Sequence, residues 1–228
     1  YLVKQLLNDF PDSVVNETGI RLQGSDLIDY LYDAEAAIIG LESINSNILD
    51  KLPNLRIISK YGVGLDNIDL EACHKRNIKV GWTGGVNKLS VAEMTLGFML
   101  ALFRNLYKTS NKLKELRWVK NGGSQLSEKK VGIIGLGNIG TELVKLLKPF
   151  NCSILVNDIK NIDDLEGKLK IKVVSKKHLF SKSDIISIHT PLTDKTKNLF
   201  NAKIFRLMKN DAFLINTSRG GIVNENDL

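Results

Sequence analysis

The chain has 228 residues, enough for one large domain or two modest ones, and its 43% hydrophobic and 25% charged residues are ordinary for a globular protein. The formal charge of +7 is scattered through helix-like segments, which favours solvated faces or small anionic substrates over nucleic acid. Two cysteines, Cys73 and Cys152, show no metal-ligand spacing, so we expect no disulfide, no metal site and a cytoplasmic location.

The first half of the chain alternates helical and extended patterns. The opening residues YLVKQLLNDF read as a helix with no strand before it, and position 1 is not methionine. We therefore expect a truncated N-terminus. The strands expected next are Ala37–Leu41, Leu55–Lys60 and Ile78–Trp82, and the helices are Gly24–Tyr32 and Asp69–Asn77. This alternation predicts a parallel sheet with helices on its faces.

A domain boundary is expected around Thr83–Lys88, where a glycine pair precedes a long helical pattern. That helix should begin at Ser90, because a serine followed three residues later by Glu93 forms a capping box. It should then run towards Tyr107. The sequence thus divides into domains over 1–87 and 88–228.

The middle of the chain carries the longest apolar helical run, Val91–Phe103. This run is shorter than the roughly 20 residues needed to cross a bilayer and contains a glutamate, so no membrane span is expected. A second helical segment, Ser110–Lys120, should end at Asn121-Gly122-Gly123. A second series of strands should follow, near 131–135, 153–157, 171–174, 184–188 and 212–216.

A glycine-rich turn lies between the first of these strands and the helical pattern TELVKLLKPF. Its sequence is Gly135-Leu136-Gly137-Asn138-Ile139-Gly140. The first glycine permits a tight turn, the second lets a pyrophosphate approach the backbone, and the third allows close packing of helix and strand. The exposed N–H groups and positive end of the helix would face the phosphates. The motif therefore predicts a dinucleotide site.

Asp158 ends the second strand of this series and bears on which dinucleotide binds. A carboxylate there can accept hydrogen bonds from both ribose hydroxyls and repels a 2′-phosphate, which favours NAD over NADP. Lys160 weighs mildly against this choice, because a cation could receive the extra phosphate. The alternative for Asp158 is a residue that merely shapes a strand-end turn.

Five sequence blocks resemble the D-isomer-specific 2-hydroxyacid dehydrogenases, and within them the D-3-phosphoglycerate dehydrogenase-like branch. They are SKYGVGLDNIDLEAC (59–73), GVNKLSVAEMTLGFML (85–100), VGIIGLGNIG (131–140), DIISIHTPLT (184–193) and FLINTSRGGIVNENDL (213–228). The resemblance covers nearly the whole chain. It implies an α/β fold with a Rossmann-type doubly wound parallel sheet that binds NAD, preceded by a flavodoxin-like α/β substrate domain, both truncated.

The resemblance also implies where a substrate carboxylate would bind. A glycine-containing loop, Tyr61-Gly62-Val63-Gly64, follows a buried strand, and Lys60 matches the nearby basic side chain of the family. Without the resemblance, this loop would read as a simple turn. Asp66 and Asn67 are expected to shape it through side-chain hydrogen bonds. Asn87, like Ser90, is expected first as a cap or hinge residue and second as a substrate contact.

Arg219 is the strongest candidate for chemistry. It follows a strand, where open α/β sheets bind ligands, and a guanidinium can grip a 2-oxo acid by its carboxylate and carbonyl together. By resemblance Arg219 polarises the substrate carbonyl and contributes to the cofactor site. The other cofactor residues implied are His189, Thr190, Pro191, Thr217 and Ser218. Outside this motif, such an arginine would be an ordinary surface cation.

The family uses a histidine, oriented by a glutamate, to move the hydroxyl proton. None of the three histidines matches that position, because His189 lines the cofactor cleft by resemblance and His74 and His178 lie in polar helical segments. We therefore expect an NAD-dependent oxidoreductase for a small D-2-hydroxy acid, of the 3-phosphoglycerate or glycerate/glyoxylate type, that is inactive or impaired at this length. The alternative is a non-catalytic, NAD-sensing module similar to a corepressor.

A homodimer is implied by the same resemblance. The Ser90–Tyr107 helix and the loop that carries Trp118 match segments that form a two-fold interface in the family. The helix carries an apolar stripe of Met94, Phe98 and Leu102. Internal packing is the alternative explanation of that stripe.

Overall fold

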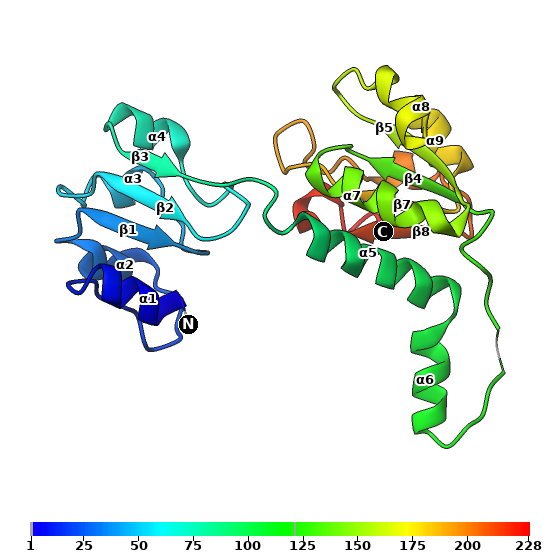
Figure 1. The fold of residues 1–228 in the computed structure, drawn as a ribbon, viewed down its shortest axis with the longest axis horizontal. Coiled ribbons are helices and arrows are strands. Elements are labelled where there is room, and N and C mark those ends of the chain that lie inside the picture. The colour runs from blue at the N-terminus through cyan, green and yellow to red at the C-terminus, as the bar shows by residue number, and fades with distance from the viewer. Residues whose placement is uncertain (1, 121) are drawn as a thin grey trace. The chain divides into compact units, whose positions relative to one another are not determined.

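The computed structural model (Figure 1) divides into two compact units, Tyr1–Gly84 (unit 1) and Gly85–Leu228 (unit 2). This division falls three residues before the predicted boundary between 87 and 88. The structure describes residues 2–120 and 122–228. The first residue of the expected opening helix, Tyr1, and the expected helix end at Asn121 therefore lie outside the described residues.

Unit 1 is a three-stranded parallel sheet in the order β1-β2-β3, with helices between its strands. Its elements are α1 (Leu2–Asp9), α2 (Gly24–Leu31), β1 (Ala36–Ile39), α3 (Ser46–Leu49), β2 (Ile57–Lys60), α4 (Leu70–Lys75) and β3 (Lys79–Gly81). The start of α4 follows from its sequence, because the carboxylate of Asp69 accepts a 2.9 Å hydrogen bond from the N–H of Ala72. Every predicted element of this half is present, and the short α3 was not predicted.

One face of the unit 1 sheet forms the core of that unit. Side chains alternate along each strand, so Ile39 and Ile58 pack against α2, α3 and α4. The opposite face carries Ile38 and Ile57, which stay exposed. Within the described residues, α1 buries none of its side chains.

Unit 2 is a five-stranded, wholly parallel sheet in the order β6-β5-β4-β7-β8. Its strands are β4 (Lys130–Ile134), β5 (Ser153–Asn157), β6 (Lys172–Val173), β7 (Ile185–Ile188) and β8 (Phe213–Asn216). Its helices are α5 (Lys88–Phe103), α6 (Leu106–Lys114), α7 (Asn138–Leu147), α8 (Glu166–Leu169), α9 (Lys176–Lys182) and α10 (Ala202–Phe205), with short 3₁₀ turns at Lys148–Phe150, Asp163–Leu165 and Gly220–Ile222. The five strands match the predicted ones to within two residues.

Both faces of the unit 2 sheet are covered, as expected for a doubly wound fold. Val131 and Ile133 of β4 face a core shared with α5 and α7, whereas Ile134 faces a second core with α9. The central strands β4 and β7 are accordingly apolar on both faces. The two-sided burial identifies the Rossmann-type architecture that the sequence predicted.

The long helix expected over Ser90–Tyr107 is wrong in its bounds. Helix α5 begins at Lys88, so Ser90 lies inside its first turn and forms no cap; Asn87 takes the position before the helix without a side-chain cap bond. The helix ends at Phe103 because Asn105 adopts a left-handed conformation with φ of +53°. Asparagine tolerates that conformation better than most residues, so the break reflects its chemistry.

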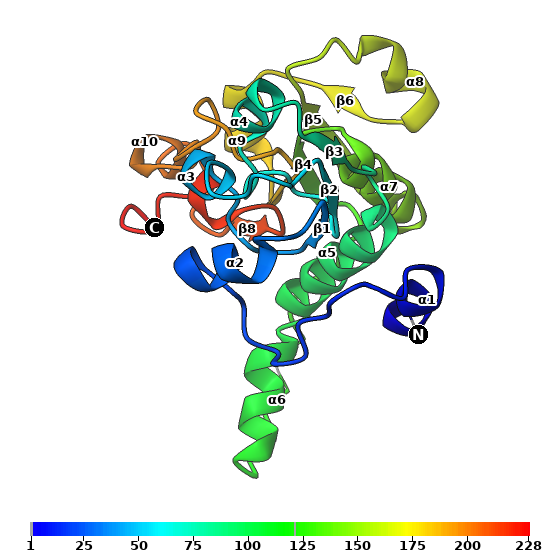
Figure 2. The same cartoon turned by 90° about the vertical axis from the view of Figure 1, so that its left-hand side faces the viewer.

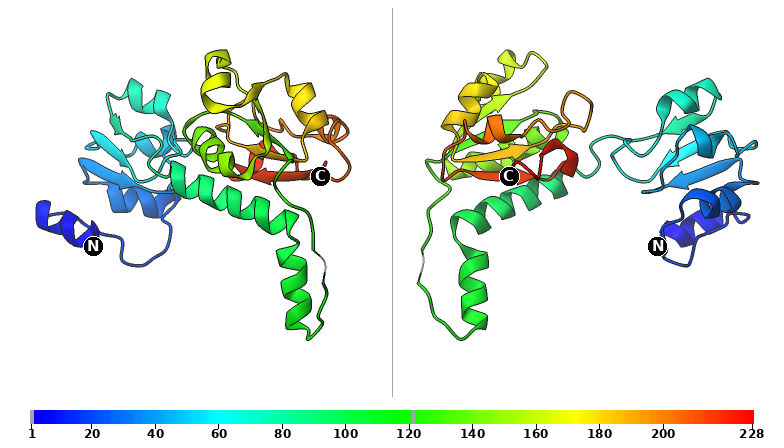
Figure 3. Two further views of the ribbon diagram at one scale, coloured as in Figure 1. Left: turned by 45° about the vertical axis from the view of Figure 1, so that its right-hand side comes forward. Right: turned by 180° about the vertical axis from the view of Figure 1, so that it is seen from behind.

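The helix expected over Ser110–Lys120 is also displaced. Helix α6 spans Leu106–Lys114, and the chain turns at Leu116, which has a positive φ of +57°. Figures 2 and 3 show α6 projecting away from the unit 2 sheet at the end of α5. Among the described residues no single helix has the length and apolar character to cross a membrane. Helices α5 and α6 have that length and apolar character only when taken together, and the two are bent by 66°.

Candidate functional site

Four loops of unit 2 follow the carboxyl ends of neighbouring strands. The chain runs from β4 outward to β5 and β6, then returns to β7 and β8 on the other side of β4. In open parallel sheets, ligands bind at the carboxyl edge where the strand order reverses in this way. The residues placed at that edge are Gly135 after β4, Asp158 after β5, His189 after β7 and Thr217 after β8. The structure therefore brings the sequence-predicted cofactor residues to one edge.

The three glycines between β4 and α7 occupy three different environments. Gly135 has a φ of +93° and lies against the carbonyl of His189, and a Cβ at Gly140 would overlap the carbonyl oxygen of Gly135. A Cβ at Gly137 would meet no protein atom within 4 Å. Two glycines thus allow close backbone packing, whereas the third leaves open space beside the first turn of α7. Asn138, Ile139 and Gly140 form that turn, whose N–H groups can bind phosphate.

Asp158 is held by the glycine-rich turn. Its Oδ2 accepts a 2.6 Å hydrogen bond from the N–H of Leu136, and its Oδ1 accepts a 2.9 Å bond from the N–H of Lys160. Each carboxylate oxygen can accept more than one hydrogen bond, so the group retains lone pairs for a sugar diol. The bond to Lys160 is the turn-shaping contact that the alternative reading of Asp158 expected. The residues at this edge fit a dinucleotide: open space beside a helix N-terminus, and a fixed carboxylate one strand away.

His189 lies half-buried at the end of β7. Its Nε2 is 2.8 Å from the hydroxyl of Ser187, which the sequence analysis did not single out. Its Nδ1 and the hydroxyl of Thr190 are buried and find no hydrogen-bond partner in the part of the chain that the structure describes. Such orphaned polar atoms are rare in folded proteins, and a ligand can satisfy them. Burial lowers the pKa of His189 to about 4, so the ring is neutral near pH 7.

The depressed pKa of His189 predicts a pH-dependent stability. An unfolded histidine titrates near pH 6.5, so between about pH 6.5 and 4 the unfolded chain binds more protons than the folded one. The free energy of unfolding should therefore fall by about 3 kcal/mol more in the wild type than in His189→Gln between pH 7 and pH 4. Urea denaturation followed by circular dichroism measures the difference, and His178→Gln, at an exposed site, should behave as the wild type. Equal pH dependence in all three proteins would contradict the burial of the imidazole.

The loop after β8 is fixed by its own side chains. Asn216 accepts a 3.0 Å bond from the N–H of Ser218 and donates a 2.8 Å bond to the carbonyl of Arg219. The Ser218 hydroxyl donates to the carbonyl of Ile188 at the end of β7. The loop is therefore tied to both strands. Asn216 was missed in the sequence, although an asparagine two residues before a strand-end serine is a recognisable local signal.

Thr217 makes a contact that the sequence did not indicate. Its hydroxyl lies 3.1 Å from that of Thr95, a fully buried residue of α5. The Thr95 hydroxyl also donates to the carbonyl of Val91, so its one proton is used and Thr217 is the donor to Thr95. A threonine within an apolar helical run was the only available sign of this buried polar pair.

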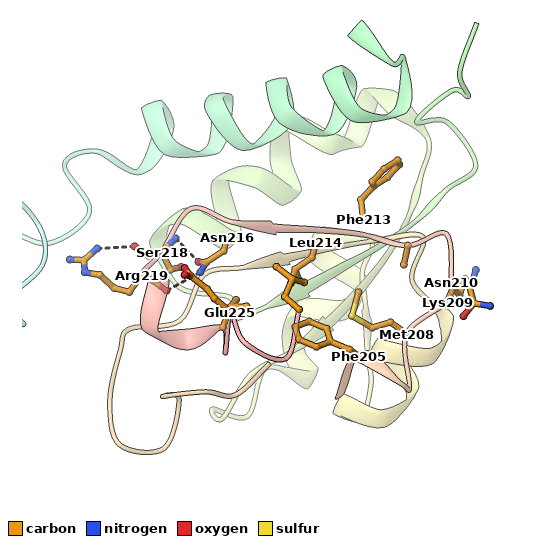
Figure 4. Close-up of a pocket in the computed structure, with 14 residues that line it drawn as sticks. Phe205, Met208, Lys209, Asn210, Phe213, Leu214, Asn216, Ser218, Arg219 and Glu225 are labelled. Atoms are coloured by element: carbon orange, nitrogen blue, oxygen red, sulfur yellow. Dashed lines mark hydrogen bonds between the residues drawn. The ribbon is translucent and has the colours of Figure 1, made fainter. Parts of the chain in front are cut away.

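Arg219 is exposed at the rim of an open pocket of about 670 Å³ along β8 (Figure 4). Its Nη1 donates to the carbonyl of Ser218 at 3.0 Å. Figure 4 shows Phe205, Met208 and Leu214 gathered at the middle of the pocket and Arg219 at one end. The glycine-rich turn, Asp158 and His189 do not line this pocket, which reaches the carboxyl edge of the sheet through the loop after β8.

In unit 1, the predicted substrate loop is supported by a polar network. The ammonium of Lys60 donates to the carbonyl of Gly40 and, at 2.9 Å, to the side-chain oxygen of Asn67. Asn67 in turn donates to the carbonyls of Gly40 and Glu42. Asn67 thus makes the predicted kind of side-chain to backbone hydrogen bond, but to the segment after β1, and its shaping of the Tyr61–Gly64 loop stays a prediction. Lys60 contributes to the same framework, and its role towards a substrate stays a prediction.

The loop itself presents backbone donors. Gly62 has a positive φ of +126°, and Tyr61 is exposed. Within the described residues, the N–H groups of Gly62, Val63 and Gly64 donate no hydrogen bond. Successive unused N–H groups of this kind can form an anion-binding concavity. The loop can thus bind a carboxylate by its backbone alone.

Comparison with known protein families identifies the second unit. Residues 96–228 match the family model described as "D-isomer specific 2-hydroxyacid dehydrogenase, NAD binding domain". Similar relatives include a hydroxypyruvate reductase of Thermotoga maritima, 34% identical over 92% of this chain, and a glyoxylate reductase of Thermofilum pendens, 37% identical over 87%. A D-3-phosphoglycerate dehydrogenase of Methanocaldococcus jannaschii is 32% identical over 93%. The chain spans 69%, 61% and 41% of these three proteins, respectively.

A solved structure supports the same assignment. The NAD-dependent formate dehydrogenase of Staphylococcus aureus in complex with NAD is 34% identical, with a TM-score of 0.86. The match covers 99% of this chain and 68% of that one. The glycine-rich turn and Asp158 therefore lie in a domain whose family binds NAD, in agreement with the fit described above.

Proposed function

Because the chain belongs to the D-isomer-specific 2-hydroxyacid dehydrogenase family, we propose that it is an NAD-dependent oxidoreductase acting on the CH–OH group of a small D-2-hydroxy acid. The observation that carries the proposal is the set of groups at the carboxyl edge of the unit 2 sheet. Open space beside Gly137 admits a pyrophosphate, and Asp158 can bind the ribose diol. Arg219 lies in the loop after β8, at the same edge.

Each of these residues has a distinct task in the proposed reaction. NAD supplies the acceptor for the hydride that leaves the substrate carbon. Arg219 binds the carboxylate of the acid and the oxygen on its neighbouring carbon, and its permanent charge stabilises negative charge that develops there. The backbone donors of Gly62, Val63 and Gly64 form a further anion-binding group. His189, neutral and bonded to Ser187, orients the cofactor and moves no proton.

The proposed substrate is glyoxylate or hydroxypyruvate, with 3-phosphoglycerate as the larger candidate. All three match the names of similar relatives, and all three are anions that suit a formal charge of +7. We propose NAD over NADP because Asp158 would repel a 2′-phosphate. A cytoplasmic location remains a prediction.

Ligand titration of the 228-residue chain tests this function. NADH should raise the melting temperature of the chain, and the fluorescence of NADH should change when it binds. NADPH should bind more weakly. No histidine of the chain occupies an acid/base position, so we expect little or no NADH formation from a panel of D-2-hydroxy acids. Failure to bind NADH would overturn the proposed function, and rapid turnover would overturn only the assignment of the histidines.

We also propose a homodimer through α5 and the segment that follows it. The apolar stripe of α5 is not internal packing, because Met94, Phe98 and Leu102 are 55%, 47% and 36% exposed, whereas Met99 and Phe103 face the core. Tyr107 of α6 and Trp118 in the loop after it are also exposed, and large exposed apolar side chains gathered in one region are typical of an interface.

The dimer is tested by a charge on the α5 stripe. Phe98→Asp would place a carboxylate in a desolvated interface, so it should weaken association by at least about 100-fold and give monomer at micromolar concentration. Sedimentation velocity measures the change. Lys177→Asp on α9, which alters charge away from the stripe, should leave the dimer intact. A wild type that is already monomeric would refute the proposal.

A further inference from the structure

Trp82 is bonded to the predicted substrate loop of unit 1. Its indole Nε1–H donates a 2.8 Å hydrogen bond to the carbonyl oxygen of Val63. Trp82 directly follows β3 and Val63 follows β2, so the contact joins the carboxyl ends of two adjacent strands. Among the described residues, it is the one side-chain hydrogen bond made to the Val63–Gly64 peptide of this loop.

This bond determines where one loop N–H can point. The carbonyl of Val63 and the N–H of Gly64 belong to the same peptide group, and the described chain contains no cis peptide bond. In a trans peptide, C=O and N–H point in opposite directions. While the carbonyl of Val63 is directed at the indole, the N–H of Gly64 must be directed away from it. A rotation of that peptide plane would reverse both groups and break the indole bond.

The indole is itself held in place by the backbone beside it. A Cβ built at Gly84 would lie 2.8 Å from the ring, so the absence of a side chain there lets the indole rest against the chain. The side chain is 48% exposed, so little of its packing is explained by the unit 1 core. A large aromatic residue that covers little core, but donates its one polar group to the loop, is placed for that hydrogen bond.

We propose that Trp82 is a positioning residue for the acid's carboxylate: its indole N–H fixes the Val63–Gly64 peptide so that the Gly64 N–H is presented as a donor. The inference rests on the proposed function, in which this loop binds a 2-oxo acid. Without the indole bond the peptide plane is free to rotate, and part of the population then turns a carbonyl oxygen towards the anion. That orientation repels a carboxylate.

The experiment compares Trp82→Phe with wild type. Phenylalanine keeps an aromatic ring and removes the N–H donor. Isothermal titration of glyoxylate into the NAD-saturated 228-residue chain should show a Kd about tenfold higher in the variant, as expected for one lost hydrogen bond. The Kd for NADH should stay within about twofold, because the dinucleotide residues lie in the other unit. Tyr30→Phe, which removes an aromatic donor to the carbonyl of Val14 elsewhere in unit 1, is the matched control and should bind both ligands as the wild type does.

A second measurement leaves Trp82 in place. In Trp118→Phe, Trp82 is the only tryptophan, so glyoxylate should change its emission in the presence of NAD. The inference is overturned if Trp82→Phe binds glyoxylate as tightly as wild type, or if glyoxylate binds without altering Trp82 emission. If the wild type binds NADH but not glyoxylate, the substrate loop is wrong and the inference falls with it. If NADH does not bind either, the proposed function itself fails.

Discussion

Alanine at position 137 should weaken NADH binding by about 100-fold while leaving the melting temperature of the chain nearly unchanged. The new methyl group meets no protein atom within 4 Å, so folding has no steric cost. It does occupy the space through which a pyrophosphate would approach the first turn of α7. Loss of one or two charge-assisted hydrogen bonds, at about 1.5–3 kcal/mol each, gives an effect of this size. Titration by NADH fluorescence measures it.

Gly140→Ala is the matched control for Gly137→Ala. Its Cβ would overlap the carbonyl oxygen of Gly135, so α7 would have to move away from β4. We expect this variant to lose at least about 3 kcal/mol of unfolding free energy, because backbone cannot yield as a flexible side chain does. One substitution should therefore affect the ligand and the other the fold. Equal NADH affinity in Gly137→Ala and wild type would show that the dinucleotide does not approach this glycine.

Replacing Arg219 by glutamine should raise the Kd for glyoxylate by more than about 100-fold without a comparable change for NADH. The guanidinium would make two charge-assisted hydrogen bonds to the acid, and glutamine can replace neither the charge nor the planar pair of donors. Arg219→Lys should fall between glutamine and wild type, since it keeps the charge but not the paired geometry. Equilibrium dialysis with radiolabelled glyoxylate and saturating NAD measures binding directly.

The backbone around Arg219 is held by other side chains of its loop. Asn216 and Ser218 fix the backbone of the loop through bonds to the Arg219 carbonyl and to Ile188, so the substitution should leave the loop in place. Arg117→Gln, an exposed arginine of the same unit, is the control for a change of net charge and should bind glyoxylate normally. Unchanged affinity in Arg219→Gln would mean that Arg219 is an ordinary surface cation.

Most of the site in unit 2 could be predicted because its signals are local. The tight turn requires a glycine at 135, and the close packing of helix and strand requires a glycine at 140. The spacing of the glycines in the sequence already indicates both requirements. The acid at the end of the next strand is equally visible. In contrast, the bond from the Leu136 N–H to Asp158 could not be foreseen, because it depends on β5 lying beside β4.

The errors in helix bounds have the opposite origin. Serine and glutamate at capping-box spacing predicted a helix start at Ser90, but the helix begins at Lys88 and Ser90 lies inside its first turn. Likewise, Asn105 gave no strong sign of a break between the apolar run and Tyr107, where the helix was expected to end. Helix termini are decided by small energies, about 1 kcal/mol for a cap, which tertiary packing readily overrides.

The sequence alone determined the α/β class, the two units, the glycine-rich turn with its acidic partner, and the family, because each depends on periodicity or on residues close together in the chain. Only the tertiary structure decided which polar groups meet: Thr95 with Thr217, and Trp82 with Val63. It also decided that the α5 stripe faces outward. Contacts of this kind depend on strand order, helix placement and peptide orientation, which are set by the packing of the whole unit and leave little trace in any short segment.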